Sequence, residues 1–265
     1  MKNYGLVIKP IEEGNYVLGG FASLPKVVLQ DNGQWGEYLP TYEPQYNSYF
    51  DSYGCAVWGT QNIVETLLKK IEGKEYNFSE RYTYNLIPIS PPGTDPHIVA
   101  EVIRMAGLID QDVLPMAEHE FDFITPRPMT QEYVNIGAKF GYTLKHEYVW
   151  NGSISKEERT EKIRECLKYS PLGVSVSAWH LENGVYVDAG QHNCHWCELY
   201  GEDEQGWLIF DSYDQSHKIL SRDHNIQICK RYMLIKKEAP VDNWLVDLIK
   251  QLYNFIKDIL TLKRG

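Results

Sequence analysis

The spacing of apolar residues changes near residue 170, and this change constrains the fold more than any other feature of the chain. Before that point apolar side chains recur every three or four positions, most clearly over 55–71, as they do on one face of an α-helix. After it they alternate in short runs that Gly and Asp separate, as they do in β-strands. Helices followed by strands predict an α+β protein with two lobes.

Residues that favour helix ends indicate where the expected helices begin and end. Asp95 and Pro96 are suited to cap and begin a helix over 97–106, and Gly107 follows it. Gly59, inside the helix expected over 55–71, indicates that another element packs closely there. Residues 1–45 are expected to be irregular, with further helices over 79–86, 129–140 and 155–168 and strands over 172–179, 195–200, 207–211 and 231–236.

Charge and cysteine content exclude several classes of protein. The formal charge is −10 and the basic stretches are short, so no nucleic-acid partner is expected. The first ten residues lack the pattern of a signal peptide, and no apolar run is long enough to cross a membrane. The 5 cysteines are an odd, sparse set, which favours a reducing compartment such as the cytoplasm over a disulfide framework.

The C-terminal segment has a helical pattern of its own. Over 241–262 apolar residues alternate between spacings of four and three. Such an amphipathic helix could dock on the body of the protein, join subunits in a homo-oligomer, or lie on a membrane surface. Docking is favoured, and few lysines flank the stripe to support membrane binding.

Cys55 and His195 are the candidates for chemistry. A cysteine is nucleophilic as a thiolate, which the N-terminus of a helix favours, and Cys55 begins the helix expected over 55–71. His195 begins a strand–turn–strand stretch that ends at Asp211, so the two lie near each other at one end of a hairpin. A carboxylate beside a histidine fixes its tautomer and stabilises its charged form. Four other histidines lie among polar residues and are expected to be exposed: His146, His180, His217 and His224.

Two other interpretations of these residues stay open. Cys55 could be a small buried apolar residue without chemistry. Cys194 and Cys197 with His192 and His195 could bind zinc, but neighbouring strand residues point to opposite faces and zinc usually draws on two separated ligand pairs. Neither a metal nor another cofactor is therefore expected.

The order and spacing of these residues resemble the papain family of cysteine peptidases. The histidine follows the cysteine by about 140 residues, and the orienting residue lies in the next strand. Residues 193–201 look like the histidine strand of the family, and 206–213 look like its tryptophan-containing strand. Residues 155–176 resemble its helix that leads into a Gly-Pro-Val strand, and the likeness spans about 45–236.

The resemblance implies a papain-like two-lobe fold over 1–236. Residues 46–150 would form the helical lobe, and 1–45 with 151–236 the packing segments and the β-rich lobe. The extra amphipathic helix would belong to 237–265. Substrate would lie in the cleft between the lobes, with Cys55, His195 and Asp211 as the catalytic triad.

Other roles are carried over from the family residue by residue. Tyr213 would shield the His–Asp hydrogen bond, Pro92 and Gly93 would line the substrate cleft, and Gln45 would stabilise the oxyanion. The chain departs from the family pattern at three places. Ala56 replaces the usual tryptophan, an aspartate replaces the usual asparagine as in transglutaminase-like relatives, and Gln45 requires the intervening loop to fold back.

The resemblance implies hydrolysis of peptide bonds in a protein or peptide substrate. The same chemistry could serve an endopeptidase or amidase acting on the peptide stem of peptidoglycan. A virion-type structural or adaptor protein that retains the fold with little activity is a further alternative. The stretch 42–65 is similar to compact bacterial and phage homologues, so a virion-associated location is considered beside the cytoplasm.

Overall fold

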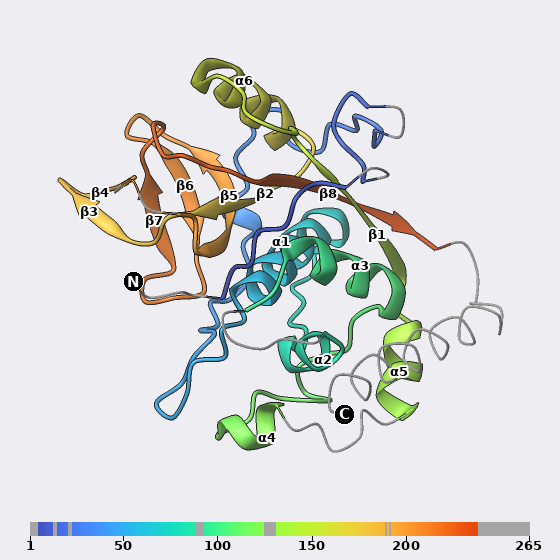
Figure 1. Cartoon of the computed structure of the whole chain (residues 1–265). Coiled ribbons are helices and arrows are strands. Elements are labelled where there is room, and N and C mark those ends of the chain that lie inside the picture. Colours follow the sequence, from blue (N-terminus) through green and yellow to red (C-terminus); the bar gives the residue numbers. More distant parts are fainter. Residues whose placement is uncertain are drawn as a thin grey trace.

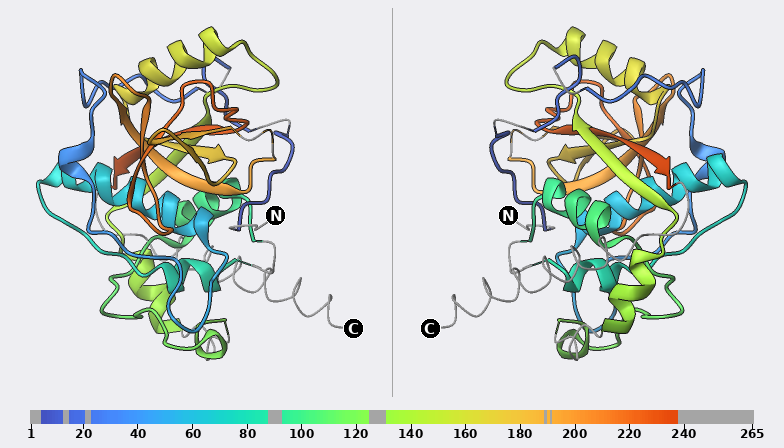
Figure 2. Two further views of the ribbon diagram at one scale, coloured as in Figure 1. Left: turned by 90° about the vertical axis from the view of Figure 1, so that its left-hand side faces the viewer. Right: turned by 90° about the vertical axis from the view of Figure 1, so that its right-hand side faces the viewer.

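Three of the helices lie on one side of the molecule and much of the sheet lies on the other. The computed structural model describes residues 5–12, 15–20, 23–87, 93–124, 131–188, 190 and 192–237. Figure 1 shows helices α2, α4 and α5 on the lower side, strands β5, β6 and β7 at the upper left, and α1 between them. Both views of Figure 2 show α6 at the end opposite those three helices. The predicted α+β class is confirmed.

Local sequence signals set the helix boundaries as predicted. The Asp95 side chain accepts a hydrogen bond from the His97 amide at 2.6 Å, and Ser155 accepts one from the Glu158 amide at 3.1 Å. Gly73 follows the helix Cys55–Glu72 and ends it with a φ of 66°, a left-handed conformation that glycine adopts without strain. The helices are η1 (Gly36–Tyr38), α1 (Cys55–Glu72), α2 (Glu80–Asn85), α3 (Pro96–Ala106), α4 (Glu120–Ile124), α5 (Gln131–Ala138) and α6 (Lys156–Leu167).

The strands form one sheet in the order β1-β8-β2-β5-β6-β7-β4-β3. Neighbouring strands run antiparallel except β4 and β7, which are parallel. The strands are β1 (Tyr142–Tyr148), β2 (Leu172–Val176), β3 (His180–Glu182), β4 (Val185–Val187), β5 (His195–Glu202), β6 (Trp207–Phe210), β7 (His217–Leu220) and β8 (Cys229–Lys236).

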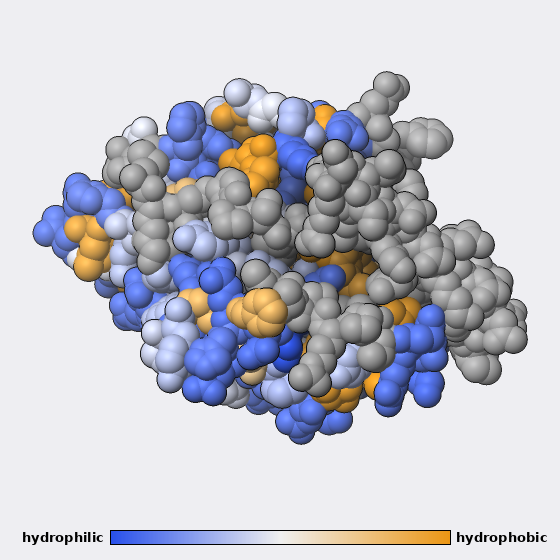
Figure 3. Space-filling model, turned by 60° about the horizontal axis from the view of Figure 1, so that its bottom comes forward, coloured by the Kyte–Doolittle hydropathy of each residue, from blue (hydrophilic) through white to orange (hydrophobic). Residues whose placement is uncertain are grey.

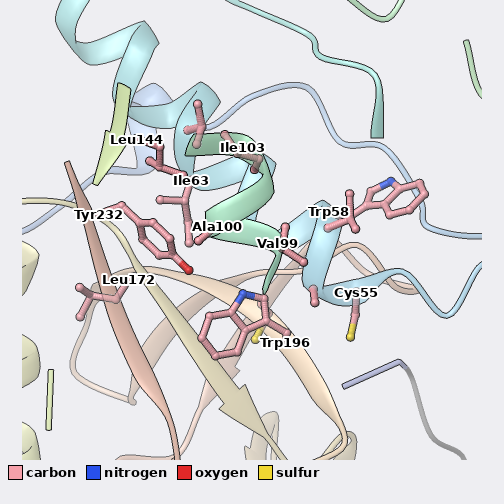
Figure 4. Packing of buried hydrophobic residues seen from close by; sticks show 14 of the residues in the cluster. Cys55, Trp58, Ile63, Val99, Ala100, Ile103, Leu144, Leu172, Trp196 and Tyr232 are labelled. Atoms are coloured by element: carbon pink, nitrogen blue, oxygen red, sulfur yellow. The ribbon is translucent and has the colours of Figure 1, made fainter. Parts of the chain in front are cut away.

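Helix α1 is the centre of the core. Its residues from Cys55 to Leu68 are all buried, because the sheet covers one side and other helices the opposite side. A Cβ on Gly59 would lie 3.0 Å from Trp196 Cδ1 and 3.2 Å from the Trp196 carbonyl oxygen. Gly59 therefore lets the helix approach the backbone of β5, as its place in the sequence predicted. In Figure 4 Trp196 extends toward α1 and α3, close to Val99 and Ala100.

Several elements were not predicted. Strands β1, β3, β4 and β7 and helix α4 are absent from the expected pattern. The range 46–150, expected to be the helical lobe, contains β1, which pairs with β8 in the sheet. The expectation that His146 and His224 are exposed is wrong: their exposures are 4% and 1%. The predicted amphipathic helix over 241–262 lies outside the described residues.

The described surface is mixed in polarity. On the face shown in Figure 3 hydrophilic residues predominate, and hydrophobic residues form separate patches. Among the large apolar side chains that are exposed are Phe121 and Tyr49. No helix within the described ranges is long and apolar enough to cross a membrane.

Candidate active site

Cys55 is the first residue of α1, next to the strand that His195 begins. The loop before it is held by a hydrogen bond from the Gly54 amide to Ser52 Oγ at 3.1 Å. Its sulfur is hydrogen-bonded by the backbone of Trp196. This places the thiol at the peptide unit that joins His195 to Trp196.

The environment of Cys55 keeps its thiol protonated. The side chain is fully buried, and this burial raises its pKa well above the ordinary value. The backbone of Trp196 lowers the pKa, whereas the negative charges of Asp211 and Asp51 raise it further. In this conformation burial therefore outweighs the helix terminus that was expected to favour the thiolate.

His195 and Asp211 meet at the end of the β5–β6 hairpin. The register pairs Glu198 with Phe210, so His195 and Asp211 both extend beyond the paired residues at the same end. His195 Nε2 donates to Asp211 Oδ1, and both side chains are fully buried. The other ring nitrogen, Nδ1, is then the one through which His195 can act as a base. The hairpin argument from the sequence predicted this contact correctly.

Aromatic side chains surround the imidazole. The Tyr213 ring lies edge-on to His195 with centroids 6.5 Å apart, and it packs on Tyr46 at 4.7 Å. Tyr213 is thus near the His–Asp hydrogen bond that it was expected to shield. Trp179 also lies edge-on to His195, at 5.6 Å. Trp179 could not be recognised from the sequence, because it lies after β2 in a segment that was expected to continue the strand.

Lys218 was also missed. Its Nζ lies 2.6 Å from Asp211 Oδ2, and the lysine side chain is 1% exposed. A signal was present: Lys218 is a lysine inside the short strand β7, and a lysine in a buried strand requires an anionic partner. Since β7 was not predicted, neither was this ion pair.

Gln45 lies at the base of a small hairpin that precedes Cys55. Tyr46 and Asp51 form an antiparallel bridge, and Ser52 N donates to Gln45 O at 3.2 Å. The Gln45 amide donates to Asp51 Oδ1 at 3.2 Å and accepts from Ser212 Oγ at 3.0 Å. The loop therefore folds back, as Gln45 would require in order to serve an oxyanion.

The two predicted cleft residues have different outcomes. Pro92 lies outside the described residues. Gly93 has a φ of 127°, and a Cβ there would lie 1.8 Å from the backbone oxygen of Gly5. The chain's own N-terminal segment therefore runs beside Gly93, where a substrate backbone was expected.

That N-terminal segment is held by backbone hydrogen bonds. The Thr94 amide donates to Gly5 O at 2.9 Å, and the Val7 amide donates to Thr94 O at 3.0 Å. A Cβ on Gly5 would lie 2.0 Å from the Tyr53 carbonyl oxygen, so the segment also touches the loop before Cys55. Any substrate approaching Cys55 from this side would meet residues 5–7 first.

The cysteines do not form a metal site in the described structure. No three His, Cys, Asp or Glu side chains within the described ranges are grouped as metal ligands would be. The Cys194 sulfur faces Ala178 O and the Cys197 sulfur faces Val174 O, each at 3.9 Å. All five cysteines are buried free thiols.

Similar proteins are found by structure and not by sequence. No family model matches the chain, and no curated protein sequence matches it. The Amb a 11 cysteine protease, a major ragweed pollen allergen, in its proform is similar with a TM-score of 0.57 and 14% identity. That alignment covers 83% of this chain and 69% of the ragweed chain.

Two further structures give the same fold. Digestive procathepsin L 3 of the Tenebrio molitor larval midgut has a TM-score of 0.52 and 14% identity, over 85% of this chain and 70% of its own. The cysteine protease and lectin-like domains of Cwp84, a surface layer associated protein of Clostridium difficile, have a TM-score of 0.62 and 11% identity. That alignment covers 89% of this chain and 57% of the Cwp84 chain.

These likenesses establish a papain-like cysteine-protease fold for the chain. At 11–14% identity they concern the fold, and function depends on the site. The neighbours come from ragweed, Tenebrio molitor and Clostridium difficile, so the compact bacterial or phage branch stays a prediction.

Proposed function

We propose that this protein is a cysteine peptidase with Cys55 as nucleophile, His195 as general base and acid, and Asp211 as the residue that orients His195. The observation that carries the proposal is the buried His195–Asp211 hydrogen bond at the strand whose backbone contacts the Cys55 sulfur. The papain-like fold supports it, because this fold has cysteine proteases among its members.

The proposed reaction follows from these positions. His195 Nδ1 takes the thiol proton of Cys55 while the sulfur attacks the carbonyl carbon of a peptide bond. The backbone N–H of Cys55, at the start of α1 where no helical acceptor exists, and the Gln45 amide would stabilise the oxyanion. The imidazolium then protonates the leaving amine, and a thioester to Cys55 remains. Water, deprotonated by His195, hydrolyses the thioester and restores the thiol.

Asp211 contributes orientation in this scheme. Because its carboxylate accepts from Nε2, the imidazole ring is fixed with Nδ1 as the reactive nitrogen. Tyr213 and Trp179 limit the access of water to this hydrogen bond. Both features favour a histidine that accepts and donates protons through Nδ1 alone.

The proposed substrate is a peptide bond in a protein or peptide. The chain carries a formal charge of −10, and like-charge repulsion disfavours docking on an anionic cell wall. Action on the peptide stem of peptidoglycan therefore ranks second. A cytoplasmic location, or a virion-associated one, accords with the same proposal.

One observation favours a different function. Cys55 and His195 are both fully buried, and a papain-like protein that serves only as a structural or adaptor component would have no need to expose them. The two proposals predict different reactivities for the Cys55 thiol toward an alkylating reagent in solution.

Alkylation separates the two. Iodoacetamide labelling at neutral pH, followed by peptide mass spectrometry, gives a separate rate for each cysteine. A peptidase is expected to label faster at Cys55 than at Cys166 or Cys194, and His195→Ala should slow Cys55 alone. Equal rates at all cysteines, unchanged by His195→Ala, would favour the adaptor.

A further inference from the structure

We propose that Lys218 is a positioning residue of this site, and that Asp211 and Lys218 act together as one charge-balanced acceptor for His195. The inference rests on the proposed function and deepens it. It concerns how the chain uses an aspartate where the resembling family has a neutral asparagine.

The two oxygens of Asp211 have different partners. Oδ1 accepts from His195 Nε2, and Oδ2 lies 2.6 Å from Lys218 Nζ. All three side chains are at most 1% exposed. A carboxylate held at both oxygens cannot rotate, so its orientation toward the imidazole depends on the lysine as well as on the hairpin.

Lys218 is itself fixed by three acceptors. Besides the carboxylate, its ammonium donates to Tyr213 O at 2.7 Å and to Gln215 O at 2.5 Å. An ammonium has three protons, and each has an acceptor here. The lysine therefore holds the turn between β6 and β7, the same turn that carries Tyr213 beside the imidazole.

Lys218 also changes the charge that His195 experiences. A lone buried carboxylate would strongly stabilise the imidazolium form, because opposite charges attract most in a water-excluded site. The adjacent ammonium cancels most of that field, so the Asp–Lys pair presents a dipole rather than a net charge. Such a pair orients the imidazole much as a neutral amide would.

The compensation matters for Cys55 as well. The negative charge of Asp211 raises the pKa of the Cys55 thiol. An ammonium beside that carboxylate reduces its effect on a nearby anion. The lysine thus reduces the penalty that an aspartate at this position places on forming the thiolate.

The proposal predicts that the two residues are coupled. Asp211→Asn alone leaves a buried ammonium without its anion, and Lys218→Met alone leaves a buried carboxylate facing the histidine. The double variant has neither unpaired charge and resembles the neutral acceptor. It should be more active than Asp211→Asn by about tenfold or more, and should melt at a higher temperature than either single variant.

The test measures Cys55 alkylation and peptide hydrolysis against pH in the wild type, both single variants and the double variant. Lys218→Met should move the pH dependence upward by about one unit, because the imidazolium loses a competing cation. Lys230→Met is the matched control: Lys230 is also fully buried, and its Nζ lies over the Tyr148 ring at 3.7 Å, away from the triad. It should lower the melting temperature and leave the pH profile in place.

Three outcomes are distinguishable. A shifted profile in Lys218→Met with recovery in the double variant supports the inference. An unshifted profile, or losses that simply multiply in the double variant, overturns it while the peptidase proposal stands. A wild type whose Cys55 labels no faster than Cys166 overturns both. If Lys218→Met does not fold, the melting temperature of the double variant relative to Asp211→Asn still decides the coupling.

Discussion

Replacing Glu198 by Gln is expected to stabilise the protein, by an amount that increases with pH. Glu198 lies on β5, the strand that His195 begins, and its side chain is fully buried. Neither of its carboxyl oxygens has a hydrogen-bond partner within 3.5 Å among the described residues. Burial raises its pKa to about 8, and the nearby Thr66 hydroxyl only partly opposes this. The folded protein therefore holds Glu198 as a neutral acid at pH 7.

The magnitude follows from the difference in pKa between the two states. In the unfolded chain a glutamate ionises near pH 4.5, so folding above that pH must take up a proton. Each unit of difference corresponds to about 1.4 kcal/mol, which gives about 5 kcal/mol at pH 8 and above. Below pH 4.5 both states are protonated and the cost vanishes. Between pH 5 and pH 7 the wild type should lose about 3 kcal/mol relative to the glutamine variant.

Urea denaturation at pH 5, 6, 7 and 8 measures this difference. Other titrating groups are common to both proteins and cancel in the comparison. Glu161→Gln, at an exposed position on α6, is the control and should give a difference that is flat with pH. A constant difference between wild type and Glu198→Gln across the range would refute the reasoning, because it would mean that Glu198 is ionised in the folded protein.

Three further perturbations test other parts of the structure. Gly59→Ala would place a Cβ 3.0 Å from Trp196 Cδ1, so we expect the free energy of unfolding to fall by about 1–3 kcal/mol, although alanine is the better helix former. We also expect slower alkylation of Cys55. An unchanged stability and an unchanged alkylation rate would contradict the close packing of α1 on β5. Burial lowers the pKa of His224 to about 4, so the folded state resists the proton that the unfolded state binds near pH 6.5. Stability should fall by about 3 kcal/mol as pH drops from 6.5 to 4, and His224→Gln should flatten the loss in denaturation experiments, whereas an equal slope would exclude His224 as its source. Leu6→Asp should release the segment beside Gly93 and increase the alkylation rate of Cys55, as measured by mass spectrometry. The control Leu181→Asp, at an exposed position, should leave that rate unchanged. Equal rates in the two variants would mean that residues 5–7 do not limit access to Cys55.

Elements with strong local signals could be predicted from the sequence. Helices α1, α3 and α6 have apolar spacing and capping residues in the chain itself, and their starts agree with the prediction within a residue or two. The His195–Asp211 contact was predictable because hairpin geometry brings the ends of paired strands together. Gly59 also served as a usable signal, since its place inside a buried helix needs a close neighbour.

Elements that depend on distant partners could not be predicted. Strand β1 alternates apolar and polar residues, but Glu147 on it is buried, because Arg231 of β8 pairs with its carboxylate. A charged residue in a strand looks exposed until its partner is known, and the same holds for Lys218. His146 appeared polar and exposed for a related reason: its Nε2 bonds Glu101 of α3 at 2.8 Å. Sequence reasoning assigns charge to the surface, whereas this fold buries charge in pairs.

The burial of Cys55 links access to activation. The described conformation keeps the thiol dry and protonated, with its pKa raised chiefly by burial, and residues 5–7 occupy the backbone position beside Gly93. A movement that admits a substrate would also admit water to the sulfur, and solvation removes the main cause of the raised pKa. The helix terminus and the Trp196 backbone would then favour the thiolate, and the carboxylates of Asp211 and Asp51 would be the main remaining opposition. Opening the site in Leu6→Asp should therefore increase the alkylation rate of Cys55 and also lower the pH at which that rate rises. A faster rate with the wild-type pH dependence would show that residues 5–7 block entry without controlling the pKa of the thiol.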